Sequence, residues 1–274
     1  MTLPHPEPVP APGAARAALF EALTTVGDEA AALLTGCRGA TALRGAQWTV
    51  AEAAAHLATA NELMAALAAG EERPYGDGTP QGLAAANAAA LAAHPLRDPD
   101  VLATRIARWT REFTAAAGPR AGSTPVRTPL GPMDLDTLGA YLLTHMLGHL
   151  YDIALALDRP HPLDRHRVAL SLPFLRTAMP RVVDPRAAAG HNARYHLRIH
   201  RLDSFTVTFT DGTATVDRNP PQRPDCTILT GPVTFFLIAL GRYSARDALA
   251  RGRILPWGRR PWLAPTFPTL FTAP

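Results

Sequence analysis

The segment from Asp134 to Leu157 constrains the fold of this chain more than any other stretch. In it, apolar and histidine side chains recur at steps of three or four residues, which places them along one side of a helix. This stripe consists of Leu135, Leu138, Leu142, His145, His149, Asp152 and Ala156. A helix of this kind is stable in water mainly because its apolar side packs against other elements. The segment therefore predicts a helical bundle with two histidines and one aspartate at inward positions.

The Ala- and Leu-rich first half of the chain predicts the helices that pack against this one. We expect them over residues 14–34, 49–70, 81–93 and 99–117. The second begins with a capping box, Thr49-Val-Ala-Glu52, in which two side chains satisfy backbone N–H groups that the first turn leaves without partners. The segment 119–132 is rich in Pro, Gly and Thr, and we expect it to be a loop. The pattern predicts an antiparallel bundle of four main helices.

The pattern of apolar and polar residues changes after residue 158. Residues 163–181 still predict helix, with a kink or break at Pro173. From Arg194 onward the pattern alternates, and it predicts strands at 195–200, 205–209, 213–216 and 226–229, short helices at 233–240 and 245–250, and a last strand at 252–255. Asp211-Gly212 has the composition of a hairpin turn. We expect an α+β module behind the bundle, with domains spanning 13–185 and 190–272.

The inward histidines have the spacing of a metal site. His145 and His149 are four residues apart, so their rings lie one above the other on adjacent turns. His56 is the one strongly polar member of the inner stripe of the second helix, which consists of Ala53, His56, Ala60, Leu63 and Leu67. Three neutral imidazoles from two helices would give a divalent ion three ligands and leave one position open. Zinc is our first choice, although imidazole also suits nickel, copper and iron.

A plainer interpretation has to be weighed against the metal site. A histidine pair at this spacing occurs by chance in many helices, and a single inward histidine is usually a satisfied core residue. However, an imidazole left without a partner in an apolar stripe costs about 1–3 kcal/mol, and a third inward histidine on a separate helix favours a common ligand. Asp152 has two readings of equal weight. It either orients a ligand histidine or acts as general base, or it forms a buried ion pair with an arginine of the C-terminal module.

Charge and composition exclude several classes of function. The 27 basic residues exceed the 23 acidic ones by only four and form no block interleaved with aromatic residues, so we expect no nucleic-acid partner. The longest apolar stretch contains both inward histidines and Asp152, so we expect no membrane partner. Residues 1–12 form a proline-rich tail without the pattern of a signal peptide. Cys37 and Cys226 have no disulfide or metal spacing, and we expect a cytoplasmic monomer or homodimer. His196 and His200 alternate along one predicted strand, and we expect both at the surface.

Two motifs resemble those of a known family. Trp48-Thr-Val-Ala-Glu-Ala-Ala-Ala-His56-Leu resembles the opening of a metal-binding helix in the DinB-like metalloproteins, specifically the mycothiol-dependent maleylpyruvate isomerase family of actinobacteria. Thr144-His-Met-Leu-Gly-His149-Leu-Tyr-Asp152 resembles the other metal helix of that family. Residues 205–216 and 225–255 are similar to the sterol-carrier-protein-2-like domain that follows many such bundles. The resemblance therefore covers most of the chain.

The resemblance implies a fold and an activity. The fold would be a DinB-like four-helix bundle followed by a smaller α+β sterol-carrier-like domain. His56, His145 and His149 would hold a divalent metal, usually zinc, whose open position takes the thiolate of mycothiol. The thiolate would then serve isomerisation or S-transfer on a small electrophile. Catalytic roles would fall to Asp152 and to an arginine of the second domain that holds a substrate carboxylate, for which Arg242 and Arg246 are the candidates.

One position departs from the isomerase pattern. The isomerases commonly carry glutamate where this sequence has His145, whereas a three-histidine set is typical of the wider DinB-like group. Replacing a carboxylate with an imidazole removes one negative charge and makes the metal a stronger Lewis acid, so maleylpyruvate is not the expected substrate. Two alternatives to the thiol-dependent enzyme remain. One is a non-catalytic carrier of lipids or small molecules in the C-terminal module, and the other is a metal-assisted enzyme that uses no thiol.

Overall fold

The computed structural model describes residues 12–45, 47–77 and 79–272. Residues 1–11, where the sequence predicts a proline-rich tail, therefore lie outside the described part of the chain. The described residues divide into two compact units, one formed by residues 19–181 and the other by residues 182–272 together with residues 12–18. The domain limits expected from the sequence, 13–185 and 190–272, stay a prediction.

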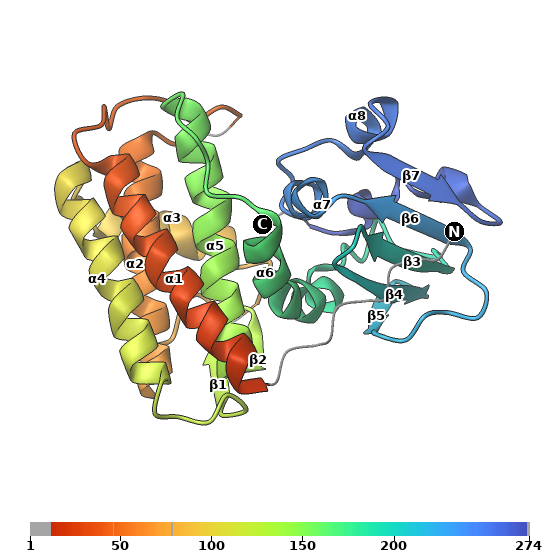
Figure 1. The fold of residues 1–274 in the computed structure, drawn as a ribbon, viewed down its shortest axis with the longest axis horizontal. Coiled ribbons are helices and arrows are strands. Elements are labelled where there is room, and N and C mark those ends of the chain that lie inside the picture. Colours follow the sequence, from red (N-terminus) through yellow and green to blue (C-terminus); the bar gives the residue numbers. More distant parts are fainter. Residues whose placement is uncertain (1–11, 46, 78, 273–274) are drawn as a thin grey trace. The chain divides into compact units, whose positions relative to one another are not determined.

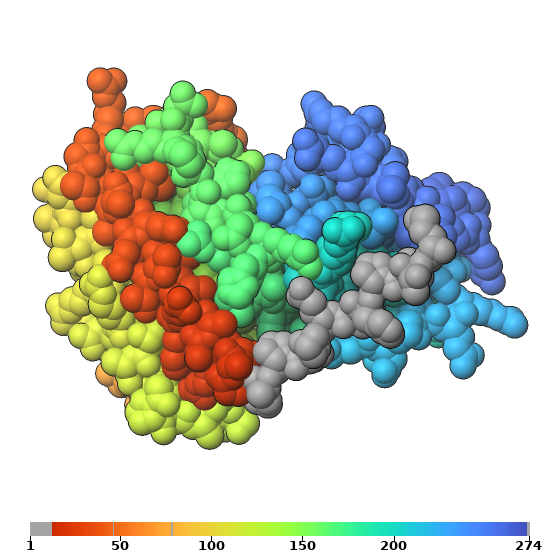
Figure 2. All heavy atoms as spheres, in the orientation of Figure 1, coloured from red at the N-terminus to blue at the C-terminus, as the bar shows by residue number. Residues whose placement is uncertain are grey.

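The larger unit is the helical bundle that the sequence predicts (Figure 1). Its four main helices are α1 (Pro12–Leu34), which belongs to this unit from Leu19 onward, α2 (Val50–Ala69), α4 (Pro99–Ala117) and α5 (Leu135–Ala156). The shorter α3 (Leu83–Ala93) packs against α2, and α6 (Arg165–Ala178) packs against α5. Helix α1 runs along the outside of this unit, where it is drawn in red in Figures 1 and 2. None of the helices in the described ranges is long and apolar enough to cross a bilayer.

Side chains at the helix ends explain why the helices begin and stop where they do. The Thr49 hydroxyl accepts the N–H of Glu52, and the Glu52 carboxylate accepts the N–H of Thr49, so the predicted capping box opens α2. Helix α2 ends at Gly70, which adopts the left-handed conformation that glycine accepts without strain. The Asp98 side chain caps α4, and the Asp134 side chain caps α5. These caps fix the rotation at which each helix presents its inner side.

The segment 119–132 was expected to be a loop, and that expectation is wrong, because its second half contains the first strand, the turn and the start of the second strand of a small hairpin. Strand β1 (Pro125–Thr128) pairs antiparallel with β2 (Gly131–Asp134). The turn between them depends on a glycine at φ 92°, and Arg181 donates to the carbonyl oxygens of Leu130 and Pro132. Each strand has only four residues, and the Pro and Gly content of the segment hides such a short alternation.

The smaller unit contains the predicted α+β module. Its strands are β3 (Ala193–Ile199), β4 (Asp203–Thr210), β5 (Thr213–Asp217), β6 (Cys226–Thr230) and β7 (Ile254–Trp257), in the order β5-β4-β3-β6-β7. Strands β3 and β6 are parallel, and the other neighbours are antiparallel. Helices α7 (Pro232–Ala239) and α8 (Ala245–Ala250) join β6 to β7. The predicted turn between β4 and β5 is confirmed, since Asp211 and Gly212 have φ values of 45° and 82°.

One side of this sheet is packed with aromatic rings. Tyr195, Phe205, Phe209 and Phe236 are buried, and the centroids of Tyr195 and Phe267 lie 4.7 Å apart. The hydroxyl of Tyr195 is 2.9 Å from Nε2 of His191, which satisfies a phenol that would otherwise be buried without a partner. The inner side of the sheet is therefore held by contacts between rings.

The opposite side of the sheet, called the outer face below, contradicts one expectation. His196 points to this face from β3, between Thr206 of β4 and Thr227 of β6. Both threonines are buried and His196 is half-buried, so His196 is not a surface residue. His200 is exposed, as predicted, but it lies beyond the end of β3 and so does not share a strand face with His196.

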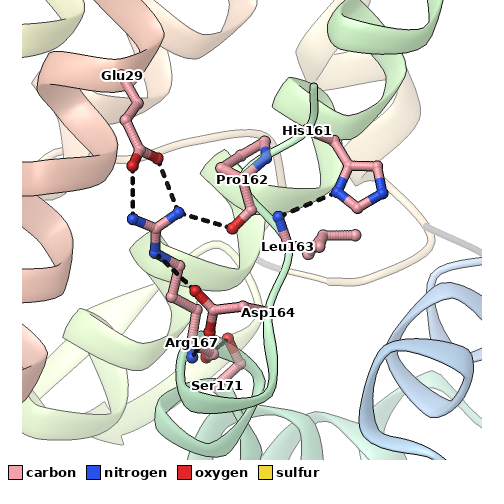
Figure 3. A network of polar contacts seen from close by, with 7 residues as sticks. All are labelled: Glu29, His161, Pro162, Leu163, Asp164, Arg167 and Ser171. Atoms are coloured by element: carbon pink, nitrogen blue, oxygen red, sulfur yellow. Dashed lines mark hydrogen bonds and ion pairs between the residues drawn. The ribbon is translucent and has the colours of Figure 1, made fainter. Parts of the chain in front are cut away.

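A charged clip joins the start of α6 to α1 (Figure 3). Both terminal nitrogens of Arg167 contact the carboxylate of Glu29 at 2.7 Å, and one of them also donates to the carbonyl oxygen of Pro162. The Arg167 side chain is 14% exposed, so this pair is screened by solvent less than an ordinary surface ion pair. The clip fixes the connection between α5 and α6 against the outermost helix.

We expect Arg167→Leu to lower the free energy of unfolding by about 1–3 kcal/mol, because Glu29 and the Pro162 carbonyl lose a partly buried donor. The measurement is urea unfolding followed by the helical circular dichroism signal. Arg111→Leu is the matched control, since its pair with Asp28 is exposed on both sides and should contribute less than about 1 kcal/mol. Equal effects of the two substitutions would contradict a special role for the clip.

Candidate metal centre

Three histidine rings meet between α2 and α5. His56 comes from α2, whereas His145 and His149 come from adjacent turns of α5. The ring centroids lie 4.9 Å apart for His56 and His145, 4.9 Å for His56 and His149, and 4.7 Å for the two histidines of α5. One nitrogen from each ring lies within 4.8 Å of the others. The structure thus brings together the three residues that the sequence singles out.

The local sequence explains why the rings converge. The capping box fixes the start of α2 at Val50, and His56 follows two turns later on the side that faces α5. In α5, the cap at Asp134 and the inward leucines Leu135, Leu138 and Leu142, all fully buried, set the rotation of the helix. His145 and His149 continue that stripe. The apolar packing of the first half of α5 therefore aims the polar residues of its second half.

The environment keeps His56 neutral. Its side chain is 4% exposed, and burial lowers its pKa from the ordinary value to about 4, because a low-dielectric surrounding disfavours the charged ring. His145 and His149 are half-buried, so the site is closed on the α2 side and more open along α5. Nε2 of His56 lies 2.9 Å from Nε2 of His145. A neutral imidazole with an available lone pair is the form that binds a metal.

The arrangement fits a tetrahedral ion. Two nitrogens bound to one zinc at about 2.0–2.1 Å are about 3.3 Å from each other. The His56–His145 pair, at 2.9 Å, is already near that separation, and no pair of ligand nitrogens exceeds 4.8 Å. Rotating the rings by movements of about 1.5 Å or less would therefore satisfy all three bonds. A three-histidine set leaves a fourth position for a small ligand.

Trp48 covers part of the triad. Its ring lies 5.1 Å from the His56 ring and 6.0 Å from the His149 ring, nearly parallel to the latter. The backbone around it is fixed by hydrogen bonds from Leu43 to Trp48 and from Val50 to Thr41. Trp48 immediately precedes the capping box, so the signal that starts α2 also places an aromatic ring beside the histidines. The sequence motif contained this residue, but sequence reasoning gave it no role at the site.

Tyr141 borders the triad on the other side, and sequence reasoning missed it. It lies one turn before His145 on α5, with its ring perpendicular to that of His145 at 6.3 Å and stacked on Phe174 of α6 at 4.2 Å. Burial, and to a lesser extent the neighbouring Tyr75, raise the pKa of Tyr141 above its ordinary value. The spacing of four residues from His145 was the one signal available in the sequence.

The three residues predicted to be catalytic lie in different parts of the chain. Asp152 is half-buried on α5, three residues after His149. Arg242 follows α7 and donates to the carbonyl oxygen of Leu240, and Arg246 lies on α8, so both belong to the smaller unit. The catalytic roles assigned to these three residues stay predictions.

Comparison with known proteins supports the fold. No protein-family model matches the chain, and no curated protein matches it in sequence. Among solved structures, it is similar to a histidine-to-alanine mutant of a mycothiol-dependent maleylpyruvate isomerase, with a TM-score of 0.50 and 14% identity over 90% of this chain and 93% of that one. Another structure of a mycothiol-dependent maleylpyruvate isomerase gives a TM-score of 0.46 with 16% identity over 85% and 91%.

A second kind of protein matches over a shorter stretch. A stereoselective inverting sec-alkylsulfatase from Pseudomonas sp. has a TM-score of 0.33 and 16% identity over 61% of this chain. The chain spans only 27% of the length of the sec-alkylsulfatases that it matches. The fold of this protein therefore resembles that of the maleylpyruvate isomerase with the TM-score of 0.50. In the present chain it consists of a helical bundle, which contains the three-histidine cluster, followed by an α+β region.

We expect protein purified without added metal to contain about one divalent ion per chain, measured by inductively coupled plasma mass spectrometry. His56→Ala, His145→Ala and His149→Ala should each lose most of it, because two imidazoles bind a divalent ion far more weakly than three. His94→Ala is the matched control, since His94 is exposed and lies outside the cluster. Metal content that is unchanged in all three cluster variants would contradict the site.

Trp48 supplies a second, optical test of the same site. Cu²⁺ or Ni²⁺ added to metal-free protein should quench part of the tryptophan fluorescence, because the Trp48 ring lies 5.1 Å and 6.0 Å from two of the ligand rings. Trp48→Phe should abolish this part of the quenching and still bind the ion, as measured by equilibrium dialysis. Trp109→Phe serves as the control. Quenching that persists in Trp48→Phe would place the ion elsewhere.

Proposed function

We propose that this protein is a metal-dependent enzyme of the maleylpyruvate isomerase type, which uses a low-molecular-weight thiol, mycothiol, for isomerisation or S-transfer on a small electrophilic substrate. The observation that carries the proposal is the convergence of His56, His145 and His149 from two helices. The similarity of the fold to a mycothiol-dependent maleylpyruvate isomerase supports it. We propose zinc as the resident ion.

The three histidines would hold the ion and leave one position open. A divalent cation there would lower the pKa of a bound thiol, so that the nucleophilic thiolate is present at neutral pH. The half-buried sides of His145 and His149 give that position an approach that the fully buried His56 does not. Trp48 limits access of water on one side of the triad. The chain thus offers a partly sheltered place where a sulfur nucleophile can meet an electrophile.

Asp152 is the candidate for proton transfer. It follows His149 by three residues on α5, a spacing at which two side chains of a helix are neighbours, so its carboxylate would lie near the cluster. Addition of a thiolate to a conjugated double bond forms a carbon–sulfur bond, leaves a single bond that can rotate, and is reversed when the sulfur leaves. The addition breaks the π bond and the elimination restores it, so the two steps together leave the atoms of the substrate unchanged. A carboxylate at this place could accept the thiol proton or orient a ligand imidazole.

The absence of charge on three histidine ligands affects which substrates the proposed site would favour. Three neutral ligands leave the full double charge of the ion uncompensated by the protein, which favours an anionic thiolate or substrate at the open position. An isomerase with a carboxylate ligand would compensate part of that charge. We therefore propose an electrophile other than maleylpyruvate. Arg242 and Arg246 remain candidates for holding a substrate carboxylate.

The carrier alternative has less support. It needs an apolar interior in the smaller unit that can accept a ligand, whereas the inner side of the sheet is packed with rings in mutual contact, among them Phe209, Phe267 and Phe271. The thiol-independent enzyme uses the same three histidines, so only an experiment with the thiol separates it from our proposal.

Cobalt-substituted protein tests the thiol directly. We expect mycothiol to produce a sulfur-to-cobalt charge-transfer band in the near ultraviolet, because the thiolate occupies the open position. The thiol-free sugar portion of mycothiol is the control and should produce none. Protein that takes up one cobalt ion but shows no band with mycothiol would rule out the thiol while leaving the metal site intact. Metal-free protein that co-purifies with lipid would favour the carrier.

We expect Asp152→Asn to keep its metal and to lose most of its activity toward a mycothiol-dependent substrate, by roughly two to four orders of magnitude if it transfers a proton. Metal content and circular dichroism, measured on the same preparation, separate this outcome from misfolding. Asp158→Asn, at an exposed position just after α5, is the matched control. A variant that fails to fold would instead identify Asp152 as a structural residue.

A further inference from the structure

The edge of the sheet in the smaller unit exposes apolar side chains that the proposed enzyme does not use. In the described part of the chain, the large apolar residues with the most exposed surface are Val101, Leu255, Trp257 and Trp262. Three of these four lie within eight consecutive positions, two on β7 and one in the short 3-10 helix η2 (Pro261–Leu263) that comes after it. Their exposed fractions are 54% for Leu255, 42% for Trp257 and 65% for Trp262. Large apolar side chains concentrated in this way mark an interaction surface.

The register of the sheet places two of them on the outer face. Leu255 pairs with Leu229 of β6, and Trp257 pairs with Thr227, so their side chains share the face from which Arg198 and His196 project. The guanidinium of Arg198 lies 5.8 Å from the centre of the Trp257 ring. Strand β7 is the last strand of the sheet, and segment 245–260 is drawn in deep blue at the surface in Figure 2. An apolar pair and a cation thus lie side by side at an open edge.

Positive charge surrounds this edge. Residues 182–274 contain twelve arginines and six aspartates, with no lysine or glutamate, although the chain as a whole has a net charge of only +4. Arg251 and Arg253 precede β7, Arg259 and Arg260 follow it, and the first three of these are exposed. Arg259 pairs with Asp225, whereas Arg251 and Arg253, which flank Leu255 on its N-terminal side, form no ion pair with any of the residues that the structure describes. This charge would repel a second copy of the chain and attract a polyanion.

We propose that this surface, defined by Leu255, Trp257, Trp262, Arg251 and Arg253, docks the protein on an anionic phospholipid surface. Guanidinium groups bind phosphate oxygens in a two-pronged geometry, and tryptophan is favoured at the boundary between head groups and acyl chains. Leu255 supplies a side chain that inserts. A nucleic acid would use the arginines and the tryptophans but would gain nothing from an exposed leucine. A protein partner needs a wider apolar area than three side chains provide.

This docking requires no membrane-spanning segment. The expectation of no membrane partner rested on the absence of such a segment, and a peripheral contact does not need one. The arginines would attract the protein to the anionic surface from a distance, and the apolar side chains would hold it there on contact. Both groups of side chains must therefore contribute to binding. The docking proposal does not depend on the histidine cluster, because every residue of the proposed docking surface belongs to the smaller unit.

The test is co-sedimentation of the full-length protein with vesicles at low salt. We expect binding to vesicles of phosphatidylcholine mixed with an equal amount of phosphatidylglycerol, and none to phosphatidylcholine alone. Added salt should release the protein, since it screens exposed charges. Each of Arg251→Gln and Arg253→Gln should weaken partitioning about fivefold, and Leu255→Ser should weaken it further. Circular dichroism checks that each variant is folded.

Two controls match these variants. Val101→Ser removes an apolar side chain of similar exposure from α4, and Arg127→Gln removes an exposed arginine from β1, so neither should change partitioning. The proposal is overturned if the wild-type protein stays in solution with anionic vesicles, if it binds both kinds of vesicle equally, or if the Leu255 and arginine variants bind like the wild type. A single-stranded oligonucleotide that binds more tightly than the anionic vesicles would also overturn it, in favour of a nucleic-acid partner.

Discussion

The larger unit brings three imidazoles, one buried and two half-buried, to one point between α2 and α5. A polar ring in an apolar interior costs free energy unless something binds its nitrogens. His56 bears most of this cost, because it is almost fully buried and its pKa falls to about 4. A bundle that needed only stability would place leucine at these positions, as it does at Leu138 and Leu142. A ligand bound by all three histidines would offset the free-energy cost of desolvating their rings.

The bundle is built to hold these rings in register. Helix α2 is buried along most of its length between α4 and α5, so it has little freedom to rotate. Its start is fixed by the capping box, and the rotation of α5 is fixed by fully buried leucines. The Arg167–Glu29 clip and the Arg181 contacts to the β1–β2 turn hold the segments at the periphery. These contacts tie α1, α6 and the β1–β2 turn to the rest of the unit.

The two units offer different chemistry. The histidine cluster suits a reaction on a small molecule, because it is compact, partly sheltered and open along α5. The edge at β7 suits contact with an extended surface, because its apolar and cationic side chains are exposed on an open strand. Neither feature needs the other in order to form, since one depends on helix packing and the other on sheet register.

Sequence alone determined the parts of this protein that local rules govern. Helix α4 runs over the predicted residues because Asp98 caps it, Pro99 opens it, and its apolar residues repeat at helical spacing. The capping box at Thr49 and the turn at Asp211-Gly212 follow from local chemistry in the same way. The helical spacing of His145 and His149, together with the inward position of His56, was enough to name the three residues of the cluster.

Tertiary structure decided what depends on contacts between distant segments. Arg181, far along the chain, donates to two carbonyl groups of the β1–β2 turn, a contact that no local pattern in the sequence predicts. The buried Asn61 donates to Thr110 of α4, and sequence analysis gave no reason to expect an amide in the core. Trp48 lies beside His149 only because the start of α2 packs against α5, and Tyr141 stacks on Phe174 only because α6 packs against α5. Periodicity tells which side of a helix faces inward, whereas packing alone selects the neighbour that it meets.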